Sequence, residues 1–165
     1  MTEEKVALTR LEQEGEIAAD YLEELLDISD LDGDLDIDVE NGRSVVAIVS
    51  EESGDRWLRR LVGKDGEVLD ALQELTRLAV QAKTGERSRL MLDVADFRKG
   101  IKESLQRQAA EVIERAKETG EQQSMVPMNP FERKVVHDAV KAAGLTSNSE
   151  GVEPSRYVVI IPSGA

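Results

Sequence analysis

The chain has 165 residues, 40% of them hydrophobic, and a formal net charge of -13 at pH 7. This length allows one ordinary domain or two small ones, and the lack of cysteine together with a single histidine excludes disulfides, thiolate metal sites and zinc sites built from several imidazoles. The apolar runs are too short to span a bilayer and the opening Met-Thr-Glu-Glu-Lys lacks a secretory signal, so we expect a cytoplasmic protein without stable membrane insertion.

The acidic residues are concentrated in the first third of the chain. Residues 1–55 contain 18 Asp and Glu against 3 Lys and Arg, a net charge of -15, whereas residues 56–165 contain 16 against 18, a net charge of +2. Salt screens charges over roughly 8 Å, so an acidic region need not oppose a basic site elsewhere. The net charge therefore argues against unspecific coating of nucleic acid but leaves a local nucleic-acid site open.

Hydrophobic spacing predicts a helix and a β-hairpin at the start of the chain. Residues 5–27 have the periodicity of an amphipathic helix. Apolar and acidic residues alternate from 34 to 40, the pair Asn41-Gly42 follows, and residues 45–49 are continuously apolar. This pattern is typical of a hairpin whose first strand has one wet face and whose second strand is more buried.

Two helices and a strand are predicted after the hairpin. The helices cover residues 55–62 and 66–83, and the strand covers residues 90–94. The order is then helix, strand, strand, helix, helix, strand. Apolar residues at helical spacing continue from Ile101 towards Gly120, and the polar outer face of this helix favours a connector between two modules.

The end of the chain shows a second pattern. Asn129 is expected to cap a helix that has Pro130 at its first position and Glu132 reaching back from its third. A polar stretch from Thr146 to Ser155 then precedes an apolar strand at 157–161. We therefore expect an α+β chain with a module at 1–95, a connecting helix at 96–120 and a small α/β module at 121–165.

The first candidate site is the loop Gly63-Lys64-Asp65-Gly66 between two predicted helices. Glycine lacks the side chain that would keep a phosphate from the backbone, the next helix start offers N–H groups and the positive end of its dipole, and Lys64 adds charge. Short glycine motifs also recur by chance, and the loop could be a plain turn in which Asp65 caps the helix. The basic residues just before the loop are Arg56, Arg59 and Arg60.

The second candidate site lies on the C-terminal helix. Arg133 and His137 are four residues apart and share one helix face, and the polar stretch that ends at Arg156 is expected to fold towards it. Taken alone, such a pair is more often a solvated surface, or a histidine bonded to a loop carbonyl. Both side chains could also grip a phosphate or stack on a base, and neither is expected in the core.

Both sites occur in settings that resemble known RNA-binding domains. A Gly-x-x-Gly loop within the order helix, strand, strand, helix, helix, strand resembles a KH domain of the type II topology. The runs from Pro127 to His137 and from Thr146 to Arg156 look like the single-stranded nucleic-acid-binding domain named for an Arg and a His separated by three residues. The two in this order resemble the Jag (KhpB) family of bacterial RNA-binding proteins.

The resemblance covers residues 5–162 and implies a non-enzymatic protein without a cofactor. It implies binding of single-stranded RNA in post-transcriptional regulation linked to bacterial growth or cell division, with a second small KH protein as a partner to be tested. An acid within the phosphate loop departs from what such a loop needs and puts the affinity of the KH half in doubt. The expected RNA-binding residues are Gly63, Lys64, Asp65, Gly66, Arg56, Arg59, Arg60, Arg133, His137 and Arg156.

Other functions remain open or are excluded. A protein-interaction adaptor whose acidic N-terminal face recruits a basic partner is supported by the charge segregation and by the acid in the loop. A catalytic relay would need His137 and Asp138, which are adjacent in a helix and point apart. A calcium loop beginning at Asp30 has Leu35 where glycine is needed and Asn41 where glutamate is needed. We therefore expect no catalytic residue and no metal ligand.

Overall fold

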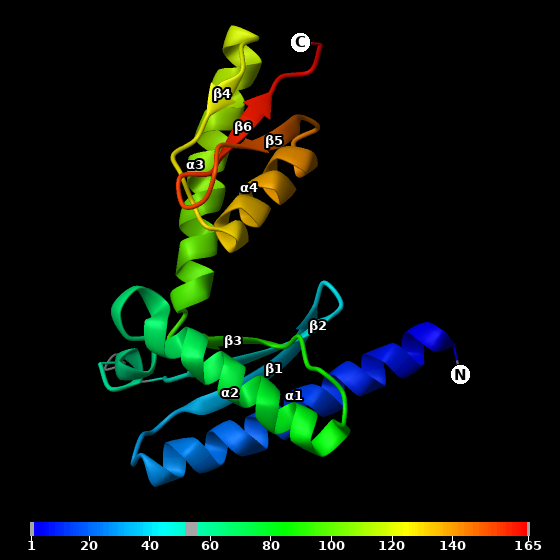
Figure 1. The fold of residues 1–165 in the computed structure, drawn as a ribbon, viewed down its shortest axis with the longest axis vertical. Helices are drawn as coiled ribbons and strands as arrows, with labels where there is room; N and C mark the ends of the chain where they lie inside the picture. The colour runs from blue at the N-terminus through cyan, green and yellow to red at the C-terminus, as the bar shows by residue number, and fades with distance from the viewer. Residues whose placement is uncertain (1, 52–55, 165) are drawn as a thin grey trace. The chain divides into compact units, whose positions relative to one another are not determined.

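A computed structural model describes residues 2–51 and 56–164 and divides the chain into an N-terminal unit, Met1–Arg98, and a C-terminal unit, Lys99–Ala165 (Figure 1). The N-terminal unit contains α1 (Glu3–Ile28), β1 (Asp34–Glu40), β2 (Arg43–Val49), the 3-10 turns η1 (Leu58–Leu61) and η2 (Lys64–Gly66), α2 (Glu67–Thr84) and β3 (Met91–Val94). Next come α3 (Phe97–Thr119), whose first two residues still belong to the N-terminal unit, β4 (Gln123–Ser124), α4 (Pro130–Ala142), β5 (Thr146–Glu150) and β6 (Tyr157–Ile161).

The N-terminal unit is built on a sheet with the strand order β1-β2-β3. Strands β1 and β2 form the predicted antiparallel hairpin, and Asn41 and Gly42 both have positive φ, 50° and 70°, as its two-residue turn requires. Strand β3 lies parallel to β2 on its other side. The apolar run at 45–49 is therefore the central strand, which confirms the prediction that it is the more buried one.

Helices α1 and α2 pack against one face of this sheet and against each other (Figure 1). Strand β1 keeps its acidic side chains on the opposite, exposed face, so the prediction of one wet face is confirmed. The core draws on both helices and on the central and third strands. Its fully buried large side chains are Leu22, Val46, Ile48, Leu58, Leu69, Val80, Leu90, Leu92 and Val94.

The segment before α2 differs from the predicted helix at 55–62. Only Leu58–Leu61 is helical, as a 3-10 turn, and the predicted first residue, Asp55, lies outside the described residues. The chain leaves helical geometry at Gly63, whose φ and ψ are 72° and -171°. Four residues are too few for an α-helix to establish its hydrogen-bond ladder before this reversal.

The C-terminal unit has a second sheet with the strand order β4-β6-β5, in which both neighbouring pairs are antiparallel. Strand β6 is the predicted apolar strand at 157–161, and it lies in the centre. The capping box that opens α4 is also as predicted, because the side chains of Asn129 and Glu132 each accept a hydrogen bond from the other residue's N–H, at 2.9 and 2.8 Å. Strand β5 is a difference, since the polar residues 146–150 carry no strand signal by themselves.

Helix α3 contributes to the core of the C-terminal unit. The segment expected as a connecting helix, 96–120, thus belongs to this packed unit from Lys99 onwards. The physical reason is its apolar stripe, which recurs at helical spacing and needs an apolar partner surface. The buried residues of this stripe are Leu105, Ala109, Ile113 and Ala116.

Candidate nucleic-acid interface

The loop from Gly63 to Gly66 joins η1 to α2 through conformations that favour glycine. Gly63 lies in a region of φ and ψ essentially restricted to glycine, and Gly66 is left-handed with φ 82°. A Cβ at Gly63 would lie 2.5 Å from Cγ2 of Val68, and a Cβ at Gly66 would lie 2.8 Å from Cε1 of Phe97. The fold itself therefore requires both glycines, whether or not a ligand binds.

The first N–H groups of α2 are already used within the chain. Glu67 donates to the carbonyl of Lys64, and Val68 and Leu69 both donate to the carbonyl of Val62, at 3.0 and 3.1 Å. The expectation that the helix start offers its N–H groups to a phosphate is therefore wrong for these three donors. A phosphate would meet the loop and the exposed Lys64 side chain instead.

Asp65 does not cap the helix. The N-cap of α2 is Gly66, and the helix start receives no side-chain cap hydrogen bond, so the interpretation of Asp65 as an N-cap is wrong. Asp65 is exposed, and its φ of 54° is left-handed. Its carboxylate follows Lys64 directly, where it offsets part of the positive charge of the loop.

The arginines before the loop are exposed and partly ordered by an aromatic ring. The guanidinium carbons of Arg56 and Arg60 lie 5.5 and 4.6 Å from the ring centroid of Trp57, which is 50% exposed. Such cation–π contacts contribute about 0.5–1 kcal/mol at exposed sites. Arg59 is exposed as well. Trp57 is a candidate that the sequence analysis missed, and its signal is the arginines one before and three after it.

Arg133 is buried, with 7% of its surface exposed. Its Nη1 donates to the carbonyl of Met128 at 2.8 Å, and its Nη2 pairs with Oε1 of Glu153 at 2.6 Å. The prediction that Arg133 lies outside the core is therefore wrong. Its guanidinium can leave water because a carbonyl and a carboxylate satisfy it, and the ion pair holds the turn at Glu153 against the start of α4.

His137 contacts two hydroxyl groups of β5. Its Nδ1 lies 2.6 Å from Oγ of Ser147, and its Nε2 lies 2.8 Å from Oγ of Ser149. Of the two nitrogens of a neutral imidazole, one donates and one accepts. These contacts confirm that the polar stretch folds towards the helix face, and they show that the partners of His137 are hydroxyls and not a loop carbonyl. Strand alternation places both serines on the same side of β5.

Arg156 joins the same cluster. Its carbonyl accepts the N–H of Met128 at 3.0 Å, and its half-buried side chain has an Nε without a hydrogen-bond partner among the residues that the structure describes. Burial lowers the pKa of His137, the charge of Arg133 lowers it further, Asp138 raises it, and the charge of Arg156 lowers it. The three candidate residues of the C-terminal unit are thus close enough to interact electrostatically.

The stability of the C-terminal unit is expected to fall as the pH drops through about 6.5. Because the folded-state pKa of His137 lies below its ordinary value of 6.5, the unfolded chain takes up the proton first, and stability present above that pH is lost below it. His137 is the sole histidine, so one NMR ring signal reports its pKa. His137→Gln should remove this pH dependence, and a folded-state pKa above 6.5 would contradict the expectation.

The alternative metal and membrane interpretations gain no support. Among residues 2–51 and 56–164, no group of three or more His, Cys, Asp or Glu could hold a metal ion. Asp34, Asp36 and Asp38, which suggested calcium, are spread along the exposed face of β1. Within the same described ranges, no helix has both the length and the apolar character that crossing a membrane requires.

Comparison with known proteins places the C-terminal unit first. The family model of the Arg-x-x-x-His domain, a single-stranded nucleic-acid-binding domain and not an enzyme family, matches residues 103–162. The match begins within α3, which agrees with the packing of that helix in the C-terminal unit. It includes Arg133 and His137, and it also includes the residues that bind them, Ser147, Ser149 and Glu153.

The chain is also similar to curated proteins named RNA-binding protein KhpB. The protein from Clostridium symbiosum is 33% identical over 144 residues, which cover 87% of this chain and 64% of the relative. The proteins from Streptococcus pneumoniae serotype 2 and Lactiplantibacillus plantarum are 33% and 30% identical over 142 residues, which cover 85% and 86% of this chain. The matched part spans 42% of the length of each of these two relatives.

Proposed function

We propose, because the chain belongs to the KhpB family, that it binds single-stranded RNA and catalyses no reaction on it. The observation that carries this proposal is the match to the Arg-x-x-x-His domain at 103–162, whose Arg133 and His137 lie within one hydrogen-bonded cluster. The name of the relatives, RNA-binding protein KhpB, supports it. We further propose a cytoplasmic role in post-transcriptional regulation linked to bacterial growth or cell division.

The N-terminal unit is proposed to be a KH-type module of the type II topology that holds RNA at its glycine loop. The order α1, β1, β2, 3-10 turns, α2, β3 and the loop position support this. Exposed Lys64 would contact a phosphate, and Arg59 with the arginines stacked on Trp57 would extend the positive surface. Val68, 41% exposed just after the loop, offers apolar surface on which a base could lie.

In the C-terminal unit, we assign different roles to the candidate residues. Arg133 is a positioning residue, because its guanidinium is buried and fully engaged with Met128 and Glu153. His137 and Arg156 are only partly buried and are proposed to contact the RNA. A neutral imidazole can stack on a base without a charge, and the guanidinium of Arg156 retains an N–H that can donate.

A protein partner is a second candidate function, and a specific surface favours it. Helix α2 exposes an apolar stripe whose members repeat at alternating steps of three and four residues, as at a helix–helix contact. Three of them are large and 41–58% exposed. We propose that a second small KH protein covers this stripe, an adaptor role that is compatible with RNA binding elsewhere. The stripe consists of Val68, Ala71, Leu75, Leu78 and Ala82.

Lys64→Asp is expected to weaken binding of a short single-stranded RNA to the full chain by about tenfold, because one charge-assisted phosphate contact is lost. Lys64 is exposed and should not affect folding. Lys83→Asp is the matched control, since it makes the same charge change at an exposed site in the last turn of α2. Binding and thermal unfolding would be measured for all three proteins.

The salt dependence of the same titrations tests the mechanism. For about three to five neutralised phosphates, log K should fall with log salt with a slope of about -2 to -3.5, and Lys64→Asp should make the slope shallower by about 0.7. A flat dependence in the unmodified chain would contradict electrostatic binding. Equal affinities of the Lys64 and Lys83 variants would show that the loop is not a phosphate site and would favour the adaptor role.

A further inference from the structure

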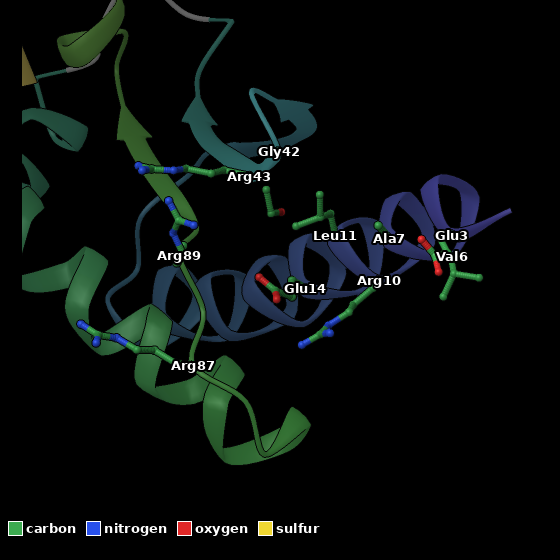
Figure 2. A pocket seen from close by; sticks show the side chains of 11 residues that line it. Glu3, Val6, Ala7, Arg10, Leu11, Glu14, Gly42, Arg43, Arg87 and Arg89 are labelled. Atoms are coloured by element: carbon green, nitrogen blue, oxygen red, sulfur yellow. The ribbon is translucent and has the colours of Figure 1, made fainter. Parts of the chain in front are cut away.

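Two adjoining cavities in the N-terminal unit share three arginines. The cavities have volumes of about 520 and 420 Å³, and Arg43, Arg87 and Arg89 line both (Figure 2). They lie by the first half of α1, the hairpin turn and the segment that follows α2. The glycine loop precedes α2, an 18-residue helix about 27 Å long, so this cluster is a separate site at the other end of that helix.

The nearby acidic side chains are largely engaged elsewhere. Glu74 pairs with Arg77 at 2.9 Å, and Glu86 pairs with Arg10. Glu3 lines only the larger cavity, and Figure 2 shows it on α1 well away from Arg43 and Arg89. These acids therefore do not neutralise the three shared arginines.

The shared arginines have no anionic partner in the part of the chain that the structure describes. Arg43, Arg87 and Arg89 form no ion pair there, although the chain contains 34 Asp and Glu. Glu14, the buried acid of the larger cavity, accepts a hydrogen bond from Ser88 at 3.0 Å. Three guanidinium groups at one cavity repel one another, and an anion placed among them would remove that repulsion.

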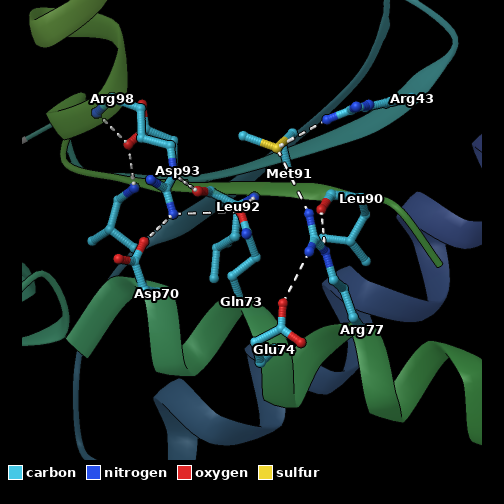
Figure 3. A network of polar contacts seen from close by, with 11 residues as sticks. Arg43, Asp70, Gln73, Glu74, Arg77, Leu90, Met91, Leu92, Asp93 and Arg98 are labelled. Atoms are coloured by element: carbon cyan, nitrogen blue, oxygen red, sulfur yellow. Dashed lines mark hydrogen bonds and ion pairs between the residues drawn. The ribbon is translucent and has the colours of Figure 1, made fainter. Parts of the chain in front are cut away.

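The positive groups are partly held in place. Nη1 of Arg43 and Nη2 of Arg77 both lie 3.8 Å from Sδ of Met91, and Nε of Arg77 donates to the carbonyl of Leu90 at 2.8 Å (Figure 3). Arg77 also lines the smaller cavity. A guanidinium that is already oriented loses less conformational freedom when it binds a ligand.

The larger cavity adds an apolar wall to this charge. Val6, Ala7 and Leu11 of α1 line it, and Val6 is 50% exposed. Ser44 also lines it, and its fully buried hydroxyl has no hydrogen-bond partner among the described residues. A concave site of a few hundred cubic ångströms with an apolar wall and a cluster of cations is typical of small-molecule sites for an anion that carries a ring.

We propose that these cavities bind one nucleotide, with its phosphate on Arg43, Arg87 and Arg89 and its base against the wall formed by Val6 and Leu11. A guanidinium fork fits the oxygens of a phosphate, and a phosphate is a compact multivalent anion. An acidic peptide fits less well, because residues 1–55 carry a net charge of -15 and would repel it along its length. The nucleotide is either free or one residue of an RNA strand, and the proposal stands independently of the glycine loop.

The test uses the full chain and three proteins. Arg87→Gln with Arg89→Gln removes two exposed cavity arginines, and Arg107→Gln with Arg115→Gln removes two exposed arginines of α3 as the charge-matched control. Each protein is titrated with AMP, with adenosine, and with a short single-stranded RNA that carries a 5′-phosphate or a 5′-hydroxyl. Thermal unfolding shows whether the variants fold as the unmodified chain does.

A free-nucleotide site predicts that AMP binds, that adenosine binds at least about tenfold more weakly, and that only the cavity variant loses AMP affinity, also by about tenfold. A strand site predicts no AMP binding but the same selective loss for the RNA. Equal behaviour of the cavity variant and the α3 control with every probe overturns the proposal. Binding of a poly-glutamate peptide in place of AMP and RNA also overturns it, in favour of an acidic protein partner.

Discussion

Arg133→Ala is expected to lower the free energy of unfolding of the C-terminal unit by about 3 kcal/mol. The substitution removes two charge-assisted hydrogen bonds of a side chain that is 7% exposed, and it leaves the carbonyl of Met128 without that donor. Glu153 is half exposed and can return to water, so the loss should stay below that of a fully buried ion pair. Denaturant unfolding of the full chain, followed by signals of the C-terminal unit, measures the effect.

Two control variants make this expectation specific. Lys134→Ala removes the next residue's exposed ion pair with Asp138 and should change stability by less than about 0.5 kcal/mol. Arg133→Lys keeps the charge but cannot reach both acceptors with the same fork, so it should restore only part of the loss. If Arg133→Ala weakens RNA binding without changing stability, the positioning role is wrong and Arg133 contacts the RNA directly.

Gly63→Ala should lower the free energy of unfolding of the N-terminal unit by about 3 kcal/mol or more. The backbone at Gly63 lies in a region that costs other residues about 1–3 kcal/mol, and the new Cβ would lie 2.5 Å from Cγ2 of Val68 and 3.0 Å from its backbone nitrogen. Backbone cannot move aside as a flexible side chain can, so overpacking adds roughly 1–3 kcal/mol. The same unfolding experiment detects this loss.

Gly42→Ala is the matched control for backbone strain alone. Gly42 has a similar positive φ of 70°, but a Cβ there would meet nothing within 4 Å. Its cost should be about 1–2 kcal/mol, so the difference between the two variants measures the steric part. Equal costs would show that Val68 moves aside. Because Gly63→Ala disturbs the fold, a loss of RNA binding in that variant is no evidence of contact, and Lys64→Asp is the cleaner probe of the loop.

Much of the secondary structure follows from short-range rules that the sequence displays directly. The Asn41-Gly42 turn, the capping box of Asn129 and Glu132 and the helical periodicity of α2 each depend on residues within a few positions of one another. For the same reason, the loop arginines and the shared helix face of Arg133 and His137 could be predicted as candidates. The family resemblance could be stated from these local motifs as well.

What the sequence left undecided depends on partners distant in the chain. Strand β5 exists because β6 pairs with it, α3 joins the C-terminal unit because α4 and β6 offer an apolar surface, and η1 stays short because the chain must reverse at Gly63. Periodicity reports which side of an element is apolar but not what covers it.

The roles of the site residues were also decided by the tertiary structure. Sequence spacing put Arg133 and His137 on one face, but only the fold brings Glu153 to the guanidinium and Ser147 with Ser149 to the imidazole. The arginine cavities combine residues from α1, the hairpin and the segment before β3, which no local pattern connects. Burial and ion pairing arise from such long-range contacts, so the sequence by itself determined the candidate residues and the tertiary structure decided which of them are engaged within the protein.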